Sequence, residues 1–157
     1  MAGDRGELFL EDLREGMRFA AGPLRVEAEE VVAFAMHYDP QPFHLDHEAV
    51  RSTLLGGRAA SGWHTAALTM RLLTEALPLA GGVIGRGGEI QWPCPMRPSD
   101  ILRIDCEVVE VQPSQSRPNE GWLTMWVTRL NARDKAEQVL TVGLLARRYP
   151  TVNPVRC

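Results

Sequence analysis

The spacing of hydrophobic residues changes once along this chain, from between three and four residues to two. Between Ser61 and Pro78, apolar residues recur three or four positions apart, as on one face of an α-helix, at Trp63, Ala66, Ala67, Met70, Leu73 and Leu77. Beyond Gly88, apolar and polar residues alternate as in a half-buried strand, with apolar Leu102, Ile104, Cys106 and Val108. The pattern predicts one long apolar helix followed by long antiparallel strands.

Turn and cap residues set the bounds of the other predicted elements. A short strand is expected over 17–26, a short helix over 27–38 and a second one from Asp46 to about Thr53. Further strands are expected at 122–130 and 139–149, joined by a turn at 131–134. The glycine-rich segment 81–88 precedes a strand and not a helix, so it is expected to be a flexible connection and not a nucleotide-binding loop. Together these elements predict an α+β fold of the hot-dog type, in which an antiparallel sheet wraps a long central helix.

Composition limits the class of protein. A chain of 157 residues with 45% hydrophobic side chains is expected to form one domain, residues 1–157. Its net charge of −3 argues against nucleic acid or a membrane surface as a partner, and no signal-peptide pattern is found, so the expected location is cytoplasmic. Three cysteines without a C-x-x-C spacing, Cys94, Cys106 and Cys157, predict neither a disulfide framework nor a zinc cluster.

The segment from Asp39 to His44 has an ionisable group at each end and two prolines between them. Pro40 and Pro42 restrict the backbone, so the segment is predicted to be a stiff, extended loop. A rigid loop can position the Asp39 carboxylate and the His44 imidazole to act on the same substrate atom with little loss of conformational entropy. The alternative is purely structural: Asp39 caps a helix and His44 fills a polar slot.

A glycine lies at the start of the long predicted helix. Ser61 is a good N-cap, and Gly62 follows it, where backbone N–H groups are unpaired and the helix dipole is positive. The Gly62 N–H is therefore a candidate donor to an oxyanion. The alternative is plain capping by Ser61, with Gly62 permitting close packing.

These two segments resemble the motif of the MaoC-like, (R)-specific enoyl-CoA hydratase family. The family motif is Asp-x-Asn-x-x-His, followed later by a small residue or histidine and then glycine, and the matching residues are Asp39, Gln41, His44, Ser61 and Gly62. Segments 9–17 and 97–100 are also similar to the family. Two positions depart from the pattern, because Gln41 replaces asparagine and Ser61 replaces a frequent histidine.

The resemblance implies a hydro-lyase that acts on acyl-CoA thioesters in fatty acid metabolism. Asp39 and His44 would hold a water and transfer protons, and the Gly62 N–H would bind the thioester oxygen. The substrate-binding residues would be Tyr38, Gln41, Ser61 and Trp63. The resemblance also implies a homodimer or a multiple of it, with neither a cofactor nor a metal. The alternatives are an acyl-CoA thioesterase on the same fold and a non-catalytic binding module for acyl-CoA or acyl carrier protein.

Three other types of site have weaker support. His37, His44, His47 and His64 do not follow a known metal-ligand spacing. Ser61 lacks the first glycine of a Gly-x-Ser-x-Gly hydrolase motif. Arg86, Arg97 and Arg117 could reach a CoA phosphate, but each is better explained as solvated surface charge.

Overall fold

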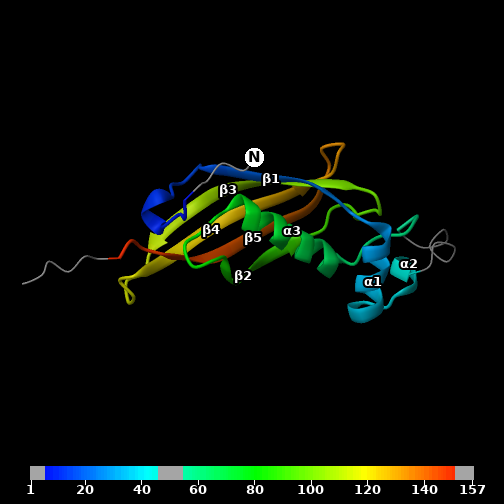
Figure 1. Ribbon diagram of the computed structural model, residues 1–157, viewed down its shortest axis with the longest axis horizontal. Helices are drawn as coiled ribbons and strands as arrows, with labels where there is room; N and C mark the ends of the chain where they lie inside the picture. The colour runs from blue at the N-terminus through cyan, green and yellow to red at the C-terminus, as the bar shows by residue number, and fades with distance from the viewer. Residues whose placement is uncertain (1–5, 46–54, 151–157) are drawn as a thin grey trace, which may run out of the picture.

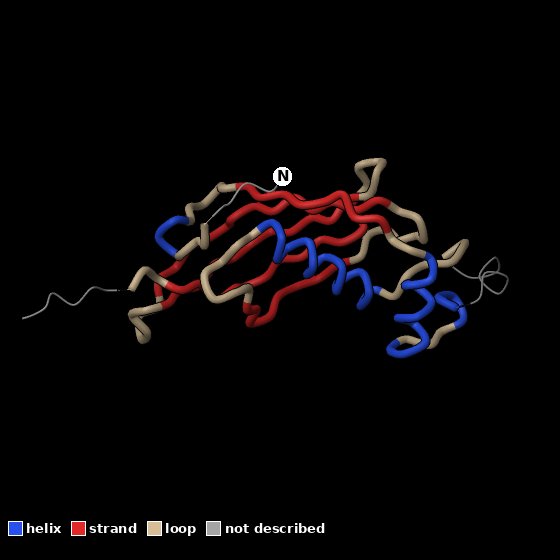
Figure 2. Tube along the Cα trace, viewed as in Figure 1, coloured by secondary structure: helices blue, strands red, loops and turns tan. Residues whose placement is uncertain are grey.

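A computed structural model of the chain describes residues 6–45 and 55–150. Five antiparallel strands form one sheet in the order β1-β3-β4-β5-β2. Figures 1 and 2 show α3 lying across one face of the curved sheet, with α1 and α2 beyond one end. The predicted α+β hot-dog architecture is confirmed. The elements in chain order are η1 (Leu10–Asp12), β1 (Arg18–Arg25), α1 (Ala28–Tyr38), α2 (Pro42–Leu45), α3 (Gly62–Ala76), β2 (Ile84–Gln91), β3 (Ile101–Pro113), β4 (Glu120–Leu130) and β5 (Ala136–Arg147).

The core lies between α3 and the sheet, and strand alternation builds it. Leu102, Ile104, Cys106 and Val108 of β3 are all buried, as their alternation predicted. Leu123, Met125 and Val127 continue the same buried layer on β4. The predicted strands at 122–130 and 139–149 correspond to β4 and β5, and the turn predicted at 131–134 joins them.

Helix α3 begins where the sequence predicted, but only part of the predicted apolar stripe is buried, at Leu73 and Leu77. The Ser61 hydroxyl caps it by accepting a hydrogen bond from the Trp63 N–H at 3.3 Å. Trp63 and Met70 of the predicted apolar stripe are 65% and 40% exposed. The buried face consists of His64, Thr65, Leu68, Thr69, Leu72, Leu73 and Ala76. With 15 residues, α3 is the longest helix of the described segments, and no helix there is long and apolar enough to cross a membrane.

The segment after α1 is not the extended loop that its prolines predicted. Pro42 begins a helical turn, α2, and the His44 N–H donates to the Gln41 carbonyl at 3.0 Å. Proline fits the first position of a helix because that N–H has no intrahelical acceptor and the ring presets a helical φ. The helix predicted over 46–53 lies outside the described residues, as does Cys157.

The glycine-rich segment is also more ordered than predicted. Gly85, Gly87 and Gly88 lie within β2, which pairs with β5 and forms one edge of the sheet. Backbone pairing to β5 compensates for the missing side chains, and a register shift between Gly85 and Gly87 interrupts the ladder. The connection between α3 and β2 is therefore limited to residues 77–83.

Candidate active site

Asp39 and His44 face each other across the short turn between α1 and α2. Asp39 caps the C-terminus of α1, and its N–H donates to the Ala35 carbonyl at 2.9 Å. The helical turn of α2 then brings His44 back, so that its Nε2 lies 3.0 Å from Asp39 Oδ2. The His44 side chain is 6% exposed and that of Asp39 is 17% exposed. The two groups are thus held together in a largely dehydrated position.

The second ring nitrogen of His44 determines what the pair can do. Its Nδ1 lies 2.6 Å from the Ala59 carbonyl oxygen, and because a carbonyl only accepts, Nδ1 carries a hydrogen. The contact between Nε2 and the Asp39 carboxylate is then attractive only when one proton lies between those two atoms. The pair therefore holds one transferable proton, which is the property that acid–base catalysis requires.

Gln41 and Ser61 also act on Asp39. The Gln41 Nε2 amide donates a hydrogen bond to Asp39 Oδ1. Burial by itself would raise the pKa of Asp39, but hydrogen bonds from Gln41 and Ser61, together with the adjacent His44, outweigh it and lower that pKa. Asp39 is therefore kept as a carboxylate. The amide of Gln41, one methylene longer than that of asparagine, reaches the carboxylate directly.

Gly62 lies at the N-terminus of α3, on the same cavity as His44. Among the described residues, none accepts a hydrogen bond from its N–H. A Cβ at this position would lie 3.0 Å from the Trp92 ring, so the close approach of Trp92 requires glycine here. Both functions considered from the sequence, a free N–H and close packing, are compatible with this position.

The cavity that His44 and Gly62 line has a volume of about 370 Å³. Its remaining walls come from the segment before α3, the first turn of α3 and the loop between β2 and β3: Leu55, Ala59, Ala60, Thr65, Trp92, Pro93, Cys94, Pro95 and Met96. Trp92 is fixed by a 3.1 Å hydrogen bond from its Nε1 to Gln138 Oε1 and by the edge of Trp63, at 5.8 Å between centroids. Asp39 is not part of this lining and contacts the cavity wall through His44.

The structure brings together some of the predicted site residues and separates others. Asp39, Gln41, His44 and Ser61 form one hydrogen-bonded group, and Gly62 shares the cavity with His44. Tyr38 and Trp63, predicted to bind substrate, are 74% and 65% exposed and lie outside the cavity lining. Their assignment as substrate-binding residues stays a prediction.

Sequence analysis missed a buried ion pair beneath the site. Arg129 and Glu137 are 0% and 1% exposed, and their Nη2 and Oε2 atoms lie 3.0 Å apart. Arg129 Nη1 also donates to the carbonyl of Thr65, which lines the cavity, at 3.1 Å. Burial lowers the pKa of Arg129 to about 10, which leaves the guanidinium charged at neutral pH. A signal was present, because Arg129 continues the alternation of the buried residues Leu123, Met125 and Val127.

The arginines considered for a phosphate site are all engaged within the chain. Arg86 stacks 4.1 Å from the ring centroid of Trp122, and Arg117 pairs with Glu120 at 3.1 Å. Arg97 donates to the carbonyl of Arg58 at 3.1 Å and to that of Leu55. Such interactions explain their positions without a ligand.

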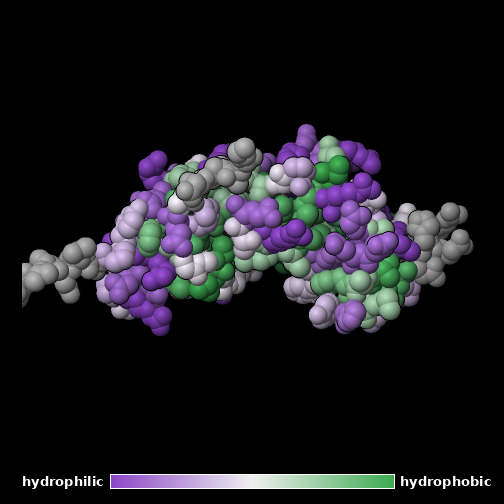
Figure 3. All heavy atoms as spheres, viewed as in Figure 1, coloured by the Kyte–Doolittle hydropathy of each residue, from purple (hydrophilic) through white to green (hydrophobic). Residues whose placement is uncertain are grey.

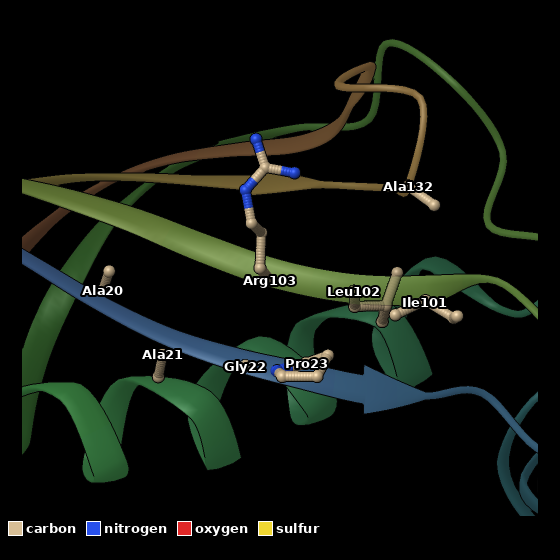
Figure 4. A pocket seen from close by; sticks show the side chains of 8 residues that line it. All are labelled: Ala20, Ala21, Gly22, Pro23, Ile101, Leu102, Arg103 and Ala132. Carbon is tan, nitrogen blue, oxygen red and sulfur yellow. The ribbon is translucent and has the colours of Figure 1, made fainter.

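A different cavity, of about 300 Å³, lies at the β1–β3 edge of the sheet (Figure 4). Its walls are mainly backbone and small apolar side chains of Ala20, Ala21, Pro23 and Leu102. Arg103 is the ionisable residue in its lining, and it forms a salt bridge with Asp134 at 2.7 Å. This lining offers no acid–base pair, so the chemistry is assigned to the cavity beside His44.

Comparisons with known proteins agree with the motif. The MaoC like domain family matches residues 14–129. A 3-hydroxybutyryl-CoA dehydratase of Methylorubrum extorquens is 32% identical over 111 residues, which are 70% of this chain and 69% of that protein. YdeM of Bacillus subtilis is 30% identical over 128 residues, or 80% and 89% of the two chains.

A solved structure extends the match to the whole fold. The MaoC-like dehydratase of Rhodospirillum rubrum is 51% identical, with a TM-score of 0.88 over 91% of this chain and 99% of that one. The matched family segment includes Asp39, His44 and Gly62. This chain therefore belongs to the MaoC-like dehydratase family.

Proposed function

We propose that this protein is a hydro-lyase that adds water to trans-2-enoyl-CoA to give (R)-3-hydroxyacyl-CoA, or catalyses the reverse dehydration. The observation that carries the proposal is the Asp39–His44 pair, 3.0 Å apart, beside a cavity that His44 and Gly62 both line. The 3-hydroxybutyryl-CoA dehydratase among its relatives supports the same reaction class. Neither a metal nor a redox cofactor is required for this chemistry.

Each residue has one step in the reaction. A water that reaches Asp39 Oδ2 and His44 Nε2 loses a proton to the pair as its oxygen attacks C3. The pair delivers a proton to C2, so one water is added and the pair regains its initial protonation. Negative charge develops on the thioester oxygen, and the Gly62 N–H at the positive end of α3 stabilises it. Ser61 and Gln41 keep the Asp39 carboxylate ionised and oriented.

Substitution of the pair tests this proposal. Asp39→Asn and His44→Ala are expected to lower hydration of trans-2-butenoyl-CoA roughly 10²–10⁴-fold, the usual contribution of general acid–base catalysis. Asp134→Asn in an exposed turn and His37→Ala on exposed α1 make the same chemical changes outside the site. Loss of enoyl absorbance measures the rate, and circular dichroism checks the fold. Full activity in either folded site variant would refute the assignment.

The same assay distinguishes the alternative functions. A thioesterase would release free CoA without loss of the enoyl chromophore, because water would attack C1 and not C3. A binding module would bind butanoyl-CoA without turning over any thioester. A thiol reagent added to the hydration assay, together with calorimetry, measures both properties.

We also propose that the functional unit is a homodimer. All but one of the β2 residues are exposed, so this sheet edge has backbone groups available for a second chain. Met36, Tyr38, Trp63 and Met70 are large apolar side chains that are at least 40% exposed. Figure 3 shows hydrophobic residues reaching the surface at the end of the molecule that carries α1 and α2. Light scattering after gel filtration would reject the proposal if the protein were monomeric at micromolar concentration.

A further inference from the structure

One wall of the cavity beside His44 begins where strand β2 leaves the sheet. The last paired residues of β2 and β5 are Gln91 and Val139, so Trp92 lies one residue beyond the pairing, on the side of Gln138. The two side chains are joined there, because Trp92 Nε1 donates to Gln138 Oε1 at 3.1 Å. Trp92 lines the cavity and Gln138 does not. Gln138 therefore connects this wall to the sheet from behind.

The chain that follows Trp92 has few polar attachments. Residues 93–95 make no backbone hydrogen bond within the described part of the chain, and Pro93 and Pro95 have no N–H to donate. Trp92 itself is 40% exposed, so packing restrains only part of its ring. Its indole has a single polar atom, Nε1. The bond to Gln138 is therefore the polar contact that fixes the position of the ring.

The position of the Trp92 ring determines the space beside Gly62. A Cβ at position 62 would lie 3.0 Å from Cε2 of the ring, the carbon that is covalently bonded to Nε1. A hydrogen bond at Nε1 thus restrains the same ring edge that approaches Gly62. Because Trp92 and Gly62 both line the cavity, a thioester bound to the Gly62 N–H would lie against this edge. Movement of the ring would let the thioester oxygen move away from that N–H.

Gln138 is a costly residue at a position where it only packs. Its side chain is fully buried, and its amide Nε2 has no hydrogen-bond acceptor within the described residues. A buried donor without an acceptor destabilises the folded state, and an apolar side chain of similar size would avoid that cost. Polar groups that break the rules of core packing are expected at functional sites.

We propose that Gln138 is a positioning residue, which acts through Trp92 to keep the thioester oxygen within hydrogen-bond distance of the Gly62 N–H. An oxyanion donor acts only when it lies about 2.7–3.1 Å from the oxygen, so a small movement of the wall is enough to lose its effect. The proposal rests on the hydratase site proposed above.

The carbonyl of a bound thioester reports this hydrogen bond directly. Butanoyl-CoA labelled with ¹³C at its carbonyl carbon cannot be hydrated, and donation from the Gly62 N–H lowers its C=O stretching frequency in isotope-edited infrared spectra. Gln138→Met removes the acceptor for Trp92 and is expected to lose about half or more of that shift. Gln138→Glu keeps an acceptor oxygen on a side chain of the same length and is expected to retain it. The control is Gln112→Met, the same change at an exposed position of β3, which should leave the shift unchanged.

Hydration of trans-2-butenoyl-CoA provides a second measurement. An oxyanion hydrogen bond strengthens in the transition state, so its misalignment lowers kcat and leaves KM unchanged. Gln138→Met is expected to lower kcat roughly tenfold or more, up to the roughly 10²–10³-fold loss that follows removal of an oxyanion donor. In a Trp92→Phe background the same substitution should have no further effect on kcat, because the indole N–H is already absent. Equal losses in the two backgrounds would show that Gln138 does not act through Trp92.

The carbonyl shift also decides the remaining outcomes. The assignment is wrong if folded Gln138→Met keeps the full shift, if Gln112→Met loses it as well, or if the unmodified protein does not bind butanoyl-CoA or does not shift its carbonyl. If Gln138→Met does not fold, Trp92→Phe removes the donor instead, and an unchanged shift in that variant would also exclude the assignment. If the shift depends on Gln138 but no enoyl-CoA is turned over, the hydratase proposal fails and the role of Gln138 in positioning the acyl carbonyl is supported.

Discussion

The contact between Gly62 and Trp92 leads to a quantitative prediction about the start of α3. In Gly62→Ala the new Cβ would lie 3.0 Å from two indole atoms and 3.2 Å from a third, whereas carbon atoms usually pack about 3.5–4.0 Å apart. The ring cannot move freely, because its Nε1 is bonded to Gln138 and Trp63 packs beside it. Overpacking of this kind costs about 1–3 kcal/mol. The gain in helix propensity offsets about 1 kcal/mol of this cost, so a net loss of up to about 2 kcal/mol in the free energy of unfolding is expected.

A double-mutant cycle separates the clash from every other effect of the new methyl group. Trp92→Leu removes the ring, and in that background Gly62→Ala is expected to be neutral or to stabilise the protein by up to about 1 kcal/mol. The effect of the methyl group should therefore differ between the two backgrounds by about 1–3 kcal/mol. Urea unfolding followed by circular dichroism measures all four proteins. Equal effects within about 0.5 kcal/mol, the limit for independent sites, would show that Trp92 does not require glycine at position 62.

Three further predictions concern buried groups. Burial lowers the pKa of His64 below 6.5, so protonation of its ring disfavours the folded state. The free energy of unfolding is therefore expected to fall more steeply below pH 6.5 in the unmodified protein than in His64→Gln. Urea unfolding from pH 7 to pH 5 measures both proteins. Burial raises the pKa of the Cys106 thiol to about 12, so little reactive thiolate is present there at neutral pH. In the folded protein, iodoacetamide should alkylate the partly exposed Cys94 and leave Cys106 unmodified, as measured by peptide mass spectrometry. Arg129→Met leaves Glu137 buried without its partner, so the free energy of unfolding, measured with urea, should fall by about 3–5 kcal/mol. A loss under about 1 kcal/mol would contradict the assigned ion pair.

The sheet could be predicted from sequence because alternation is a local property. Each inward residue of β3 is apolar and each neighbour is polar or outward-facing, so the two faces of the strand can be read directly. Arg129, Glu137 and Gln138 do not follow that rule. Glu137 and Gln138 are adjacent in sequence and both buried, beside a register shift between β4 and β5, and local alternation does not reveal such a shift.

The site motif was easier to identify than its local geometry. The spacing of Asp39 and His44 placed both residues in one turn, and the structure shows that turn to be helical where two prolines predicted extension. A proline excludes helix only where its missing N–H is needed, and at the first position of α2 it is not needed. Thr65 and Met96 could not be connected from sequence, because they lie 31 residues apart and meet only through folding.

Helix α3 shows why its buried face was assigned wrongly. Trp63 and Met70 are exposed in the single chain, whereas the polar residues His64, Thr65 and Thr69 are buried together with Leu68, Leu72 and Leu73. Thr65 and Thr69 are compatible with the core because Arg129 binds the Thr65 carbonyl and the Thr69 hydroxyl donates to that same carbonyl at 3.0 Å. The homodimer proposed above would cover the exposed Trp63 and Met70. A hydrophobic pattern includes every surface that a helix buries, within the subunit or against another chain, so it does not by itself identify the face that packs inside the subunit.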